Sequence, residues 1–141
     1  MPNSLPNNAH SPSPARREDR EFPAATARLG WRFHHLGIPT RLPKPNEKHL
    51  PEYGMFVSGF DTSEFGIEWM RFEEESPLPE IIRTVPHLAF VVDEIESALA
   101  GRDVLFPVRA PSGGVRTAMI LVDGAPIELM EFDKHGDGRA P

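Results

Sequence analysis

The chain contains one strand-like motif twice, in Gly66-Ile67-Glu68-Trp69-Met70-Arg71-Phe72-Glu73 and again in Pro126-Ile127-Glu128-Leu129-Met130-Glu131-Phe132-Asp133. Both copies read Ile-Glu-x-Met-x-Phe followed by an acid. Because alternate side chains of an extended strand share a face, the glutamate, methionine and phenylalanine of each copy point to the same side. A carboxylate among apolar neighbours is costly to bury unless a positive group compensates it. The two strands therefore predict the same kind of partner.

The candidate partners are histidines in the apolar runs that precede the two copies, residues 31–38 and 84–92. Each run holds a histidine followed by leucine and a small residue, so His35 corresponds to His87. In a regular strand only one of two adjacent residues faces the interior, and the match with His87 selects His35. His34 is then predicted to point to the opposite face. We interpret the chain as a duplicated unit that begins with a histidine strand and ends with a glutamate strand.

Length and composition limit the class of protein. A length of 141 residues and a hydrophobic fraction of 39% predict one domain with a packed core. The formal net charge of −6 and the lack of a basic run with interleaved aromatics argue against a nucleic-acid partner. The sequence has no cysteine, which excludes disulfides and thiolate chemistry and fits a reducing compartment. No apolar run resembles a signal peptide or could span a bilayer, so we expect a cytoplasmic protein without membrane contact.

The expected domain covers residues 30–133 and consists of the modules 30–75 and 83–133. Residues 1–29 are rich in proline, asparagine, serine and arginine, and they cannot bury enough surface to offset their ordering entropy. We predict that they form a disordered tail and that residues 134–141 form a flexible one.

The second module is predicted to contain a strand, a short helix and three further strands. The helix is expected over residues 93–100, with Asp93 as its N-cap and Glu96 three residues later. In the first module four prolines between residues 39 and 53 exclude a full helix. This module is therefore expected to have the same strands with an irregular connection in place of the helix. Residues 74–83 are predicted to be a linker between the modules.

Two histidines and two glutamates, one pair from each module, would meet if the curved sheets of the modules formed a common trough. Imidazole nitrogen and carboxylate oxygen together suit divalent Zn, Ni, Co, Mn or Fe, and four protein ligands leave coordination positions open. Taken singly, a strand histidine is more often a hydrogen-bonded core residue, and a lone strand glutamate is usually solvated. The repeated order with matching flanks favours a metal site, for which the predicted ligands are His35, Glu68, His87 and Glu128.

The order of these motifs resembles the vicinal oxygen chelate superfamily, which includes glyoxalase I, methylmalonyl-CoA epimerase, extradiol dioxygenases and drug-resistance proteins. The resemblance covers residues 31–133 and rests on His-Leu-Gly-Ile, the two Ile-Glu-x-Met-x-Phe segments and His-Leu-Ala-Phe-Val-Val-Asp. It implies an α+β fold in which two paired βαβββ modules form one cupped mixed sheet, with the helix of the first module reduced here. It also implies one metal ion held by the first and last strands of both modules, and the His, Glu, His, Glu set is similar to that of nickel- or cobalt-type glyoxalase I.

Under this resemblance the expected function is that of a metal-dependent lyase or isomerase of the glyoxalase type. A small substrate would bind the metal through two adjacent oxygens, and Glu128 or Glu68 would act as the base. The first module is short, and no basic cluster marks a site for glutathione or coenzyme A. The substrate is therefore left open.

Three alternatives compete with this function. The first is an iron(II) ring-cleaving dioxygenase with His35, His87 and Glu128 as its facial triad and Glu68 as a bystander. The second is a non-catalytic binding or resistance protein of the same fold, often a homodimer, that holds a small molecule in the trough. The third, a cupin-type barrel, is ranked last because the chain lacks a closely spaced His-x-His pair.

Overall fold

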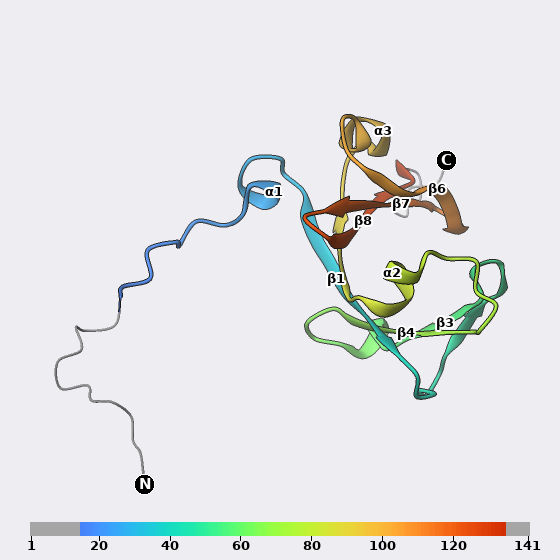
Figure 1. Ribbon diagram of the computed structural model, residues 1–141. Helices are drawn as coiled ribbons and strands as arrows, with labels where there is room; N and C mark the ends of the chain where they lie inside the picture. Colours follow the sequence, from blue (N-terminus) through green and yellow to red (C-terminus); the bar gives the residue numbers. More distant parts are fainter. Residues whose placement is uncertain (1–14, 135–141) are drawn as a thin grey trace, which may run out of the picture.

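The computed structural model describes residues 15–134, and it contains one strongly curled sheet with a few short helices (Figure 1). The strands are β1 (Arg32–Thr40), β2 (Lys48–Leu50), β3 (Met55–Ser58), β4 (Ile67–Phe72), β5 (His87–Val91), β6 (Val104–Ser112), β7 (Val115–Val122) and β8 (Ala125–Phe132). The helical segments are α1 (Ala24–Ala27), η2 (Pro51–Tyr53), η3 (Phe60–Thr62), α2 (Glu80–Thr84) and α3 (Ile95–Leu99).

The strand order β2-β3-β4-β1-β5-β8-β7-β6 divides the sheet into two equivalent halves. In each half the first strand pairs in parallel with the last, β1 with β4 and β5 with β8. The two first strands, β1 and β5, pair with each other in antiparallel orientation at the centre of the sheet. The predicted α+β fold of two paired modules that share a cupped mixed sheet is thereby confirmed.

The first module has no helix where the second has α3, because residues 41–47, all of them described, form only turns and bends. The predicted irregular connection over residues 39–53 was nevertheless too long, since β1 continues to Thr40 and β2 forms an edge strand. Beyond Gly37, β1 pairs with β4 but no longer with β5, so Pro39 lies where one side of the strand is unpaired. That is where a strand tolerates a proline.

Helix α3 covers the outer face of the second half and seals an apolar cluster against β7 and β8. The buried members of this cluster are Val92, Ile95, Ala118, Ile120 and Leu129. The helix is shorter than predicted because Glu94, not Asp93, is its N-cap, and no side-chain capping bond forms. The carboxylate of Glu96 instead accepts hydrogen bonds from the guanidinium of Arg116, at 2.6 and 3.0 Å.

Helix α2 lies in the segment predicted to be a plain linker, and it packs inside the trough between the two halves (Figure 1). A second buried cluster forms there from Met55, Met70, Leu78, Ile82 and Met119. The segment that joins the modules therefore also fills part of the inner face of the sheet.

The predicted tails fall partly outside the described residues, which exclude 1–14 and 135–141. Within residues 15–29 the chain forms one helical turn, α1, just before β1. Among the helices of residues 15–134, none has the length and apolar character needed to cross a bilayer.

We predict that Leu129→Ala destabilises the protein by about 3 kcal/mol, because it leaves a cavity between α3 and the sheet at a side chain that is 0% exposed. Urea denaturation measures the free energy of unfolding. The matched control is Leu42→Ala, whose side chain is 66% exposed and should change stability by less than about 0.5 kcal/mol. Equal losses of stability in the two variants would contradict the burial of Leu129 between α3 and the sheet.

Candidate functional site

The four strands at the centre of the sheet, β4-β1-β5-β8, carry the four residues singled out in the sequence. Two rows of in-register residues cross these strands on the same face: Glu68, Gly37 and His87, followed by His35, Ala89 and Glu128. Residues in register on neighbouring strands point to the same side of a sheet, and so do residues two apart on one strand. The strand order thus places both histidines and both glutamates on the concave face.

The small residues in the middle of each row make room for the imidazole rings. A Cβ atom added at Gly37 would lie within 2.8 Å of both ring nitrogens of His87, so the ring lies directly over the backbone of β1. Ala89, which is fully buried, holds the equivalent place opposite His35. This explains physically why each histidine is followed two residues later by glycine or alanine.

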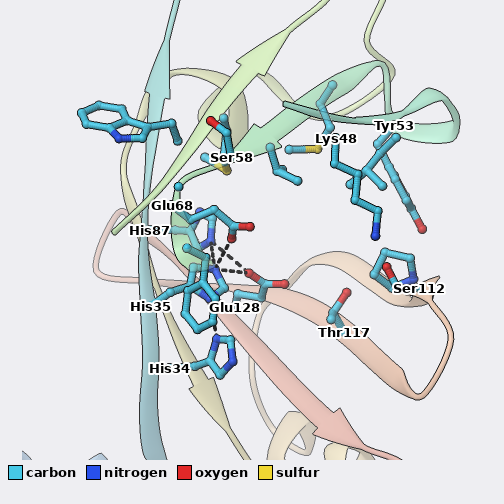
Figure 2. A pocket seen from close by; sticks show the side chains of 18 of the residues that line it. His34, His35, Lys48, Tyr53, Ser58, Glu68, His87, Ser112, Thr117 and Glu128 are labelled. Carbon is cyan, nitrogen blue, oxygen red and sulfur yellow. Dashed lines mark hydrogen bonds and ion pairs between the residues drawn. The ribbon is translucent and has the colours of Figure 1, made fainter. Parts of the chain in front are cut away.

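The side-chain nitrogen and oxygen atoms that could bind a metal lie close together in the centre of the sheet (Figure 2). Nε2 of His35 lies 3.2 Å from Oε1 of Glu68 and 3.2 Å from Oε1 of Glu128. Nε2 of His87 lies 3.0 Å from the same Glu128 oxygen and 3.4 Å from Nε2 of His35. Metal bonds of about 2.1 Å at angles of 90–109° separate neighbouring ligand atoms by about 3.0–3.4 Å. The spacing therefore fits a shared divalent ion.

Three of the four residues form the tightest group. The ligand atoms of His35, His87 and Glu128 all lie within 4.8 Å of one another. Glu68 is not in that group and contacts it through His35. The side chains of the two histidines are 4% exposed, whereas those of Glu68 and Glu128 are 22% and 18% exposed toward the cavity.

Burial and neighbouring charges shift the protonation of the group in different directions. Burial alone would raise the pKa of Glu128, but hydrogen bonds from His35 and His87 outweigh it and lower this pKa to about 2. Burial would lower the pKa of His35, but its hydrogen bond with Glu128 and the charges of both glutamates raise it. Burial raises the pKa of Glu68. The charges of Glu68 and Glu128 thus favour the protonated, positive form of His35.

His34 also belongs to the site, and the prediction that it faces away was wrong. The pairing of β1 with β5 shifts register between Phe33 and His35, which marks a bulge, and His34 lines the same cavity as His35 (Figure 2). Nδ1 of His34 lies 2.8 Å from Nδ1 of His35. The ring of Phe60 stacks on His34 with centroids 4.6 Å apart and planes at 9°. Strict alternation along a strand cannot reveal a bulge, and the only signal in the sequence is the adjacent histidine pair.

A cavity of about 760 Å³ opens beside the cluster, in the size range of small-molecule sites. Its walls are largely apolar, with Met55, Val57, Met119 and Phe106 among the lining residues. His87 adds an unusual feature, because its buried Nδ1 has no hydrogen-bond partner within residues 15–134. Buried polar atoms of native proteins usually have a partner, which a bound ligand, ion or water can supply.

Comparison with solved structures supports the fold. A hypothetical protein from Bacillus halodurans matches with a TM-score of 0.59 at 19% identity, over 74% of this chain and 96% of that chain. Methylmalonyl-CoA epimerase from Mycobacterium tuberculosis matches with a TM-score of 0.48 at 17% identity, over 70% of this chain and 86% of its own. No family model and no curated protein matches the chain. At 19% identity the likeness to the first of these structures concerns the fold alone.

We predict that Gly37→Ala destabilises the protein by about 1–3 kcal/mol, because the new methyl group must displace the ring of His87. Thermal or urea unfolding measures the change. Gly113→Ala is the matched control, since a Cβ there meets nothing within 4 Å, and it should leave stability unchanged or slightly raised. A Gly37→Ala protein as stable as the control would show that the ring does not lie over β1.

Proposed function

We propose that this protein holds one divalent metal ion through His35, His87 and Glu128, with Glu68 as a fourth ligand, and acts as a lyase or isomerase on a small substrate. The observation that carries the proposal is the convergence of Nε2 and Oε1 atoms from four strands with separations of 3.0–3.4 Å. Nitrogen and oxygen ligands in this ratio suit Zn, Ni, Co, Mn and Fe(II), and four of them leave coordination positions free. Such open positions are typical of catalytic sites.

The metal would supply Lewis-acid polarisation of two adjacent substrate oxygens. The chain supplies the proton transfer. Glu68 stands outside the tight three-residue group and is partly exposed to the cavity, whereas both histidines hold Glu128. We therefore assign Glu68 as the ligand that would detach and take a proton from the substrate carbon next to the carbonyl, while Glu128 stays in place. For a hydroxy-carbonyl substrate, return of that proton to the former carbonyl carbon, with transfer of the hydroxyl proton to the former carbonyl oxygen, completes an isomerisation.

His34 supports the proposed centre as a positioning residue. A neutral imidazole that uses Nε2 as a ligand carries its proton on Nδ1, so His35 would donate this proton to Nδ1 of His34 at 2.8 Å. The stacked ring of Phe60 holds the acceptor in place. Hydrogen bonds of this kind fix the tautomer and orientation of a histidine ligand.

One observation favours a second candidate function, an iron(II) dioxygenase. The three residues of the tight group are two histidines and one carboxylate, which is the ligand set of the facial triad. Oxygen consumption by the iron(II)-loaded protein with catecholic substrates separates this function from the first. A lyase or isomerase consumes no oxygen, and it incorporates solvent deuterium next to the carbonyl of its substrate.

The test of the proposed centre is metal content after loading with Zn(II) or Co(II) and removal of excess ion. We expect one ion per chain in the unchanged protein and loss of stoichiometric binding in His35→Ala, His87→Ala and Glu128→Gln. Glu68→Gln should keep the ion with reduced affinity and lose deuterium exchange. His49→Ala is the control, because His49 pairs with Glu73 at 3.5 Å and stacks on Phe56, and it does not belong to the cavity lining. Metal-free wild type, or folded variants that bind as well as wild type, would refute the proposal.

A separate pair of variants tests His34. His34→Phe keeps an aromatic ring against Phe60 but removes the acceptor, and we expect a 10- to 100-fold loss of Zn(II) affinity. The visible spectrum of the Co(II) form should shift as well, which a purely structural role would not produce. His34→Gln, which retains an acceptor, should recover part of the affinity. Unchanged affinity and spectrum in His34→Phe would remove His34 from the centre.

A further inference from the structure

The cavity beside the cluster changes in character from one end to the other. Its acidic lining residues are Asp61, Glu68 and Glu128, and the charge of Asp61 contributes to the raised pKa of Glu68, so all three belong to the histidine end. Basic residues also line the cavity, namely Lys44, Lys48 and Arg109. Figure 2 shows Lys48 on the far side of the cavity from His35 and His87, with its amino group directed into the space. The cavity thus has a metal-ligand end and a cationic end.

Among residues 15–134, no acid pairs with the basic side chains at the cationic end. Arg109 lies over the ring of Phe106 at 5.0 Å, and Phe106 packs against Tyr53, which lies on the same side of the cavity as Lys48 (Figure 2). Within residues 15–134 neither Lys48 nor Arg109 has an ion pair or a side-chain hydrogen bond.

Some other arginines within residues 15–134 are paired with acids. Arg71, for example, donates to both carboxylate oxygens of Glu47 at 2.7 and 2.8 Å. The chain has a net charge of −6, so acids are available as partners for its basic side chains. Cations that line a cavity without an acidic partner can instead bind the anionic group of a ligand.

Apolar side chains separate the two ends. Met55, Val57, Met119 and Phe106 line the cavity, and methionine side chains adapt to apolar ligands of varied shape. An apolar ligand body displaces water along this wall. A ligand without apolar surface would gain no hydrophobic stabilisation from this wall.

We infer that the ligand is an amphipathic organic anion with two adjacent oxygens at one end, an apolar body, and a carboxylate-type group at the other end. The inference rests on the proposed metal centre for the first end and on Lys48 and Arg109 for the last. Both cations are exposed to solvent, so each contributes modestly and together they should raise affinity roughly tenfold. The gain should shrink as salt concentration rises.

Aryl hydroxamates are suitable probes, because a hydroxamate presents two adjacent oxygens to a metal. Benzohydroxamate is compared with a series that carries a para carboxylate on zero to three methylene groups, using calorimetric titration of the Zn(II)-loaded full chain. We expect the best carboxylated member to bind about tenfold tighter than benzohydroxamate. This advantage should disappear in the double variant Lys48→Met with Arg109→Gln.

The matched control is Arg28→Gln with Arg41→Gln, which removes the same charge at two exposed positions outside the cavity lining. In this control variant the best carboxylated hydroxamate should still bind about tenfold tighter than benzohydroxamate. A series without any carboxylate advantage, or an advantage that survives in the Lys48 and Arg109 double variant, overturns the inference.

Failure of the metal centre gives a different result. Aryl carboxylates without the hydroxamate are titrated into metal-free protein and into the same double variants. If Zn(II) and both hydroxamates fail to bind while aryl carboxylates still bind through Lys48 and Arg109, the proposed function is refuted and the cationic end is retained. If Zn(II) and benzohydroxamate bind normally and the carboxylate adds nothing, the metal centre stands and the inferred ligand class is wrong.

Discussion

The antiparallel pairing of β1 with β5 is the constraint on which the rest of the structure depends. Each of these strands is the first of its module, and each is flanked in parallel by the last strand of the same module. Neighbouring strands lie about 4.8 Å apart, so backbones on four adjacent strands span roughly 15 Å. The curl of the sheet turns the outer strands β4 and β8 toward each other, and the long glutamate side chains cover the remaining distance to the histidines (Figure 1).

Side-chain size decides whether two imidazole rings fit at this central seam. Gly37 lies beneath the ring of His87, and Ala89 is the in-register neighbour of His35. A larger residue at either place would push a ring off the sheet and pull its nitrogen away from the common point. The small residue two positions after each histidine is thus part of the site, although it carries no chemistry of its own.

The charge distribution of the site costs stability and therefore calls for a functional reason. Buried carboxylates and histidines are less favourable than apolar residues of similar size unless their charges are balanced. Here hydrogen bonds from His35 and His87 keep Glu128 ionised, while burial favours the protonated form of Glu68. Groups with protonation shifted in opposite directions within one cavity are characteristic of functional sites. The basic residues at the other end of the cavity extend this polarity over its whole length.

The sequence by itself determined the duplicated architecture, the absence of a helix in the first module and the four inward-facing candidates, because strand periodicity and the repeated flanks of His35, Glu68, His87 and Glu128 are local properties. It also indicated the β-strands that begin and end each module, since period-two alternation fixes which side chains share a face. Three features were decided only by the tertiary structure. The bulge that turns His34 into the site depends on how β1 pairs with β5. The place of α2 in the trough depends on the space left by the curled sheet. The presence of Lys48 and Arg109 in the lining of one cavity depends on strands from different modules. Each of these is a relation between segments far apart in the chain, which a local pattern cannot encode.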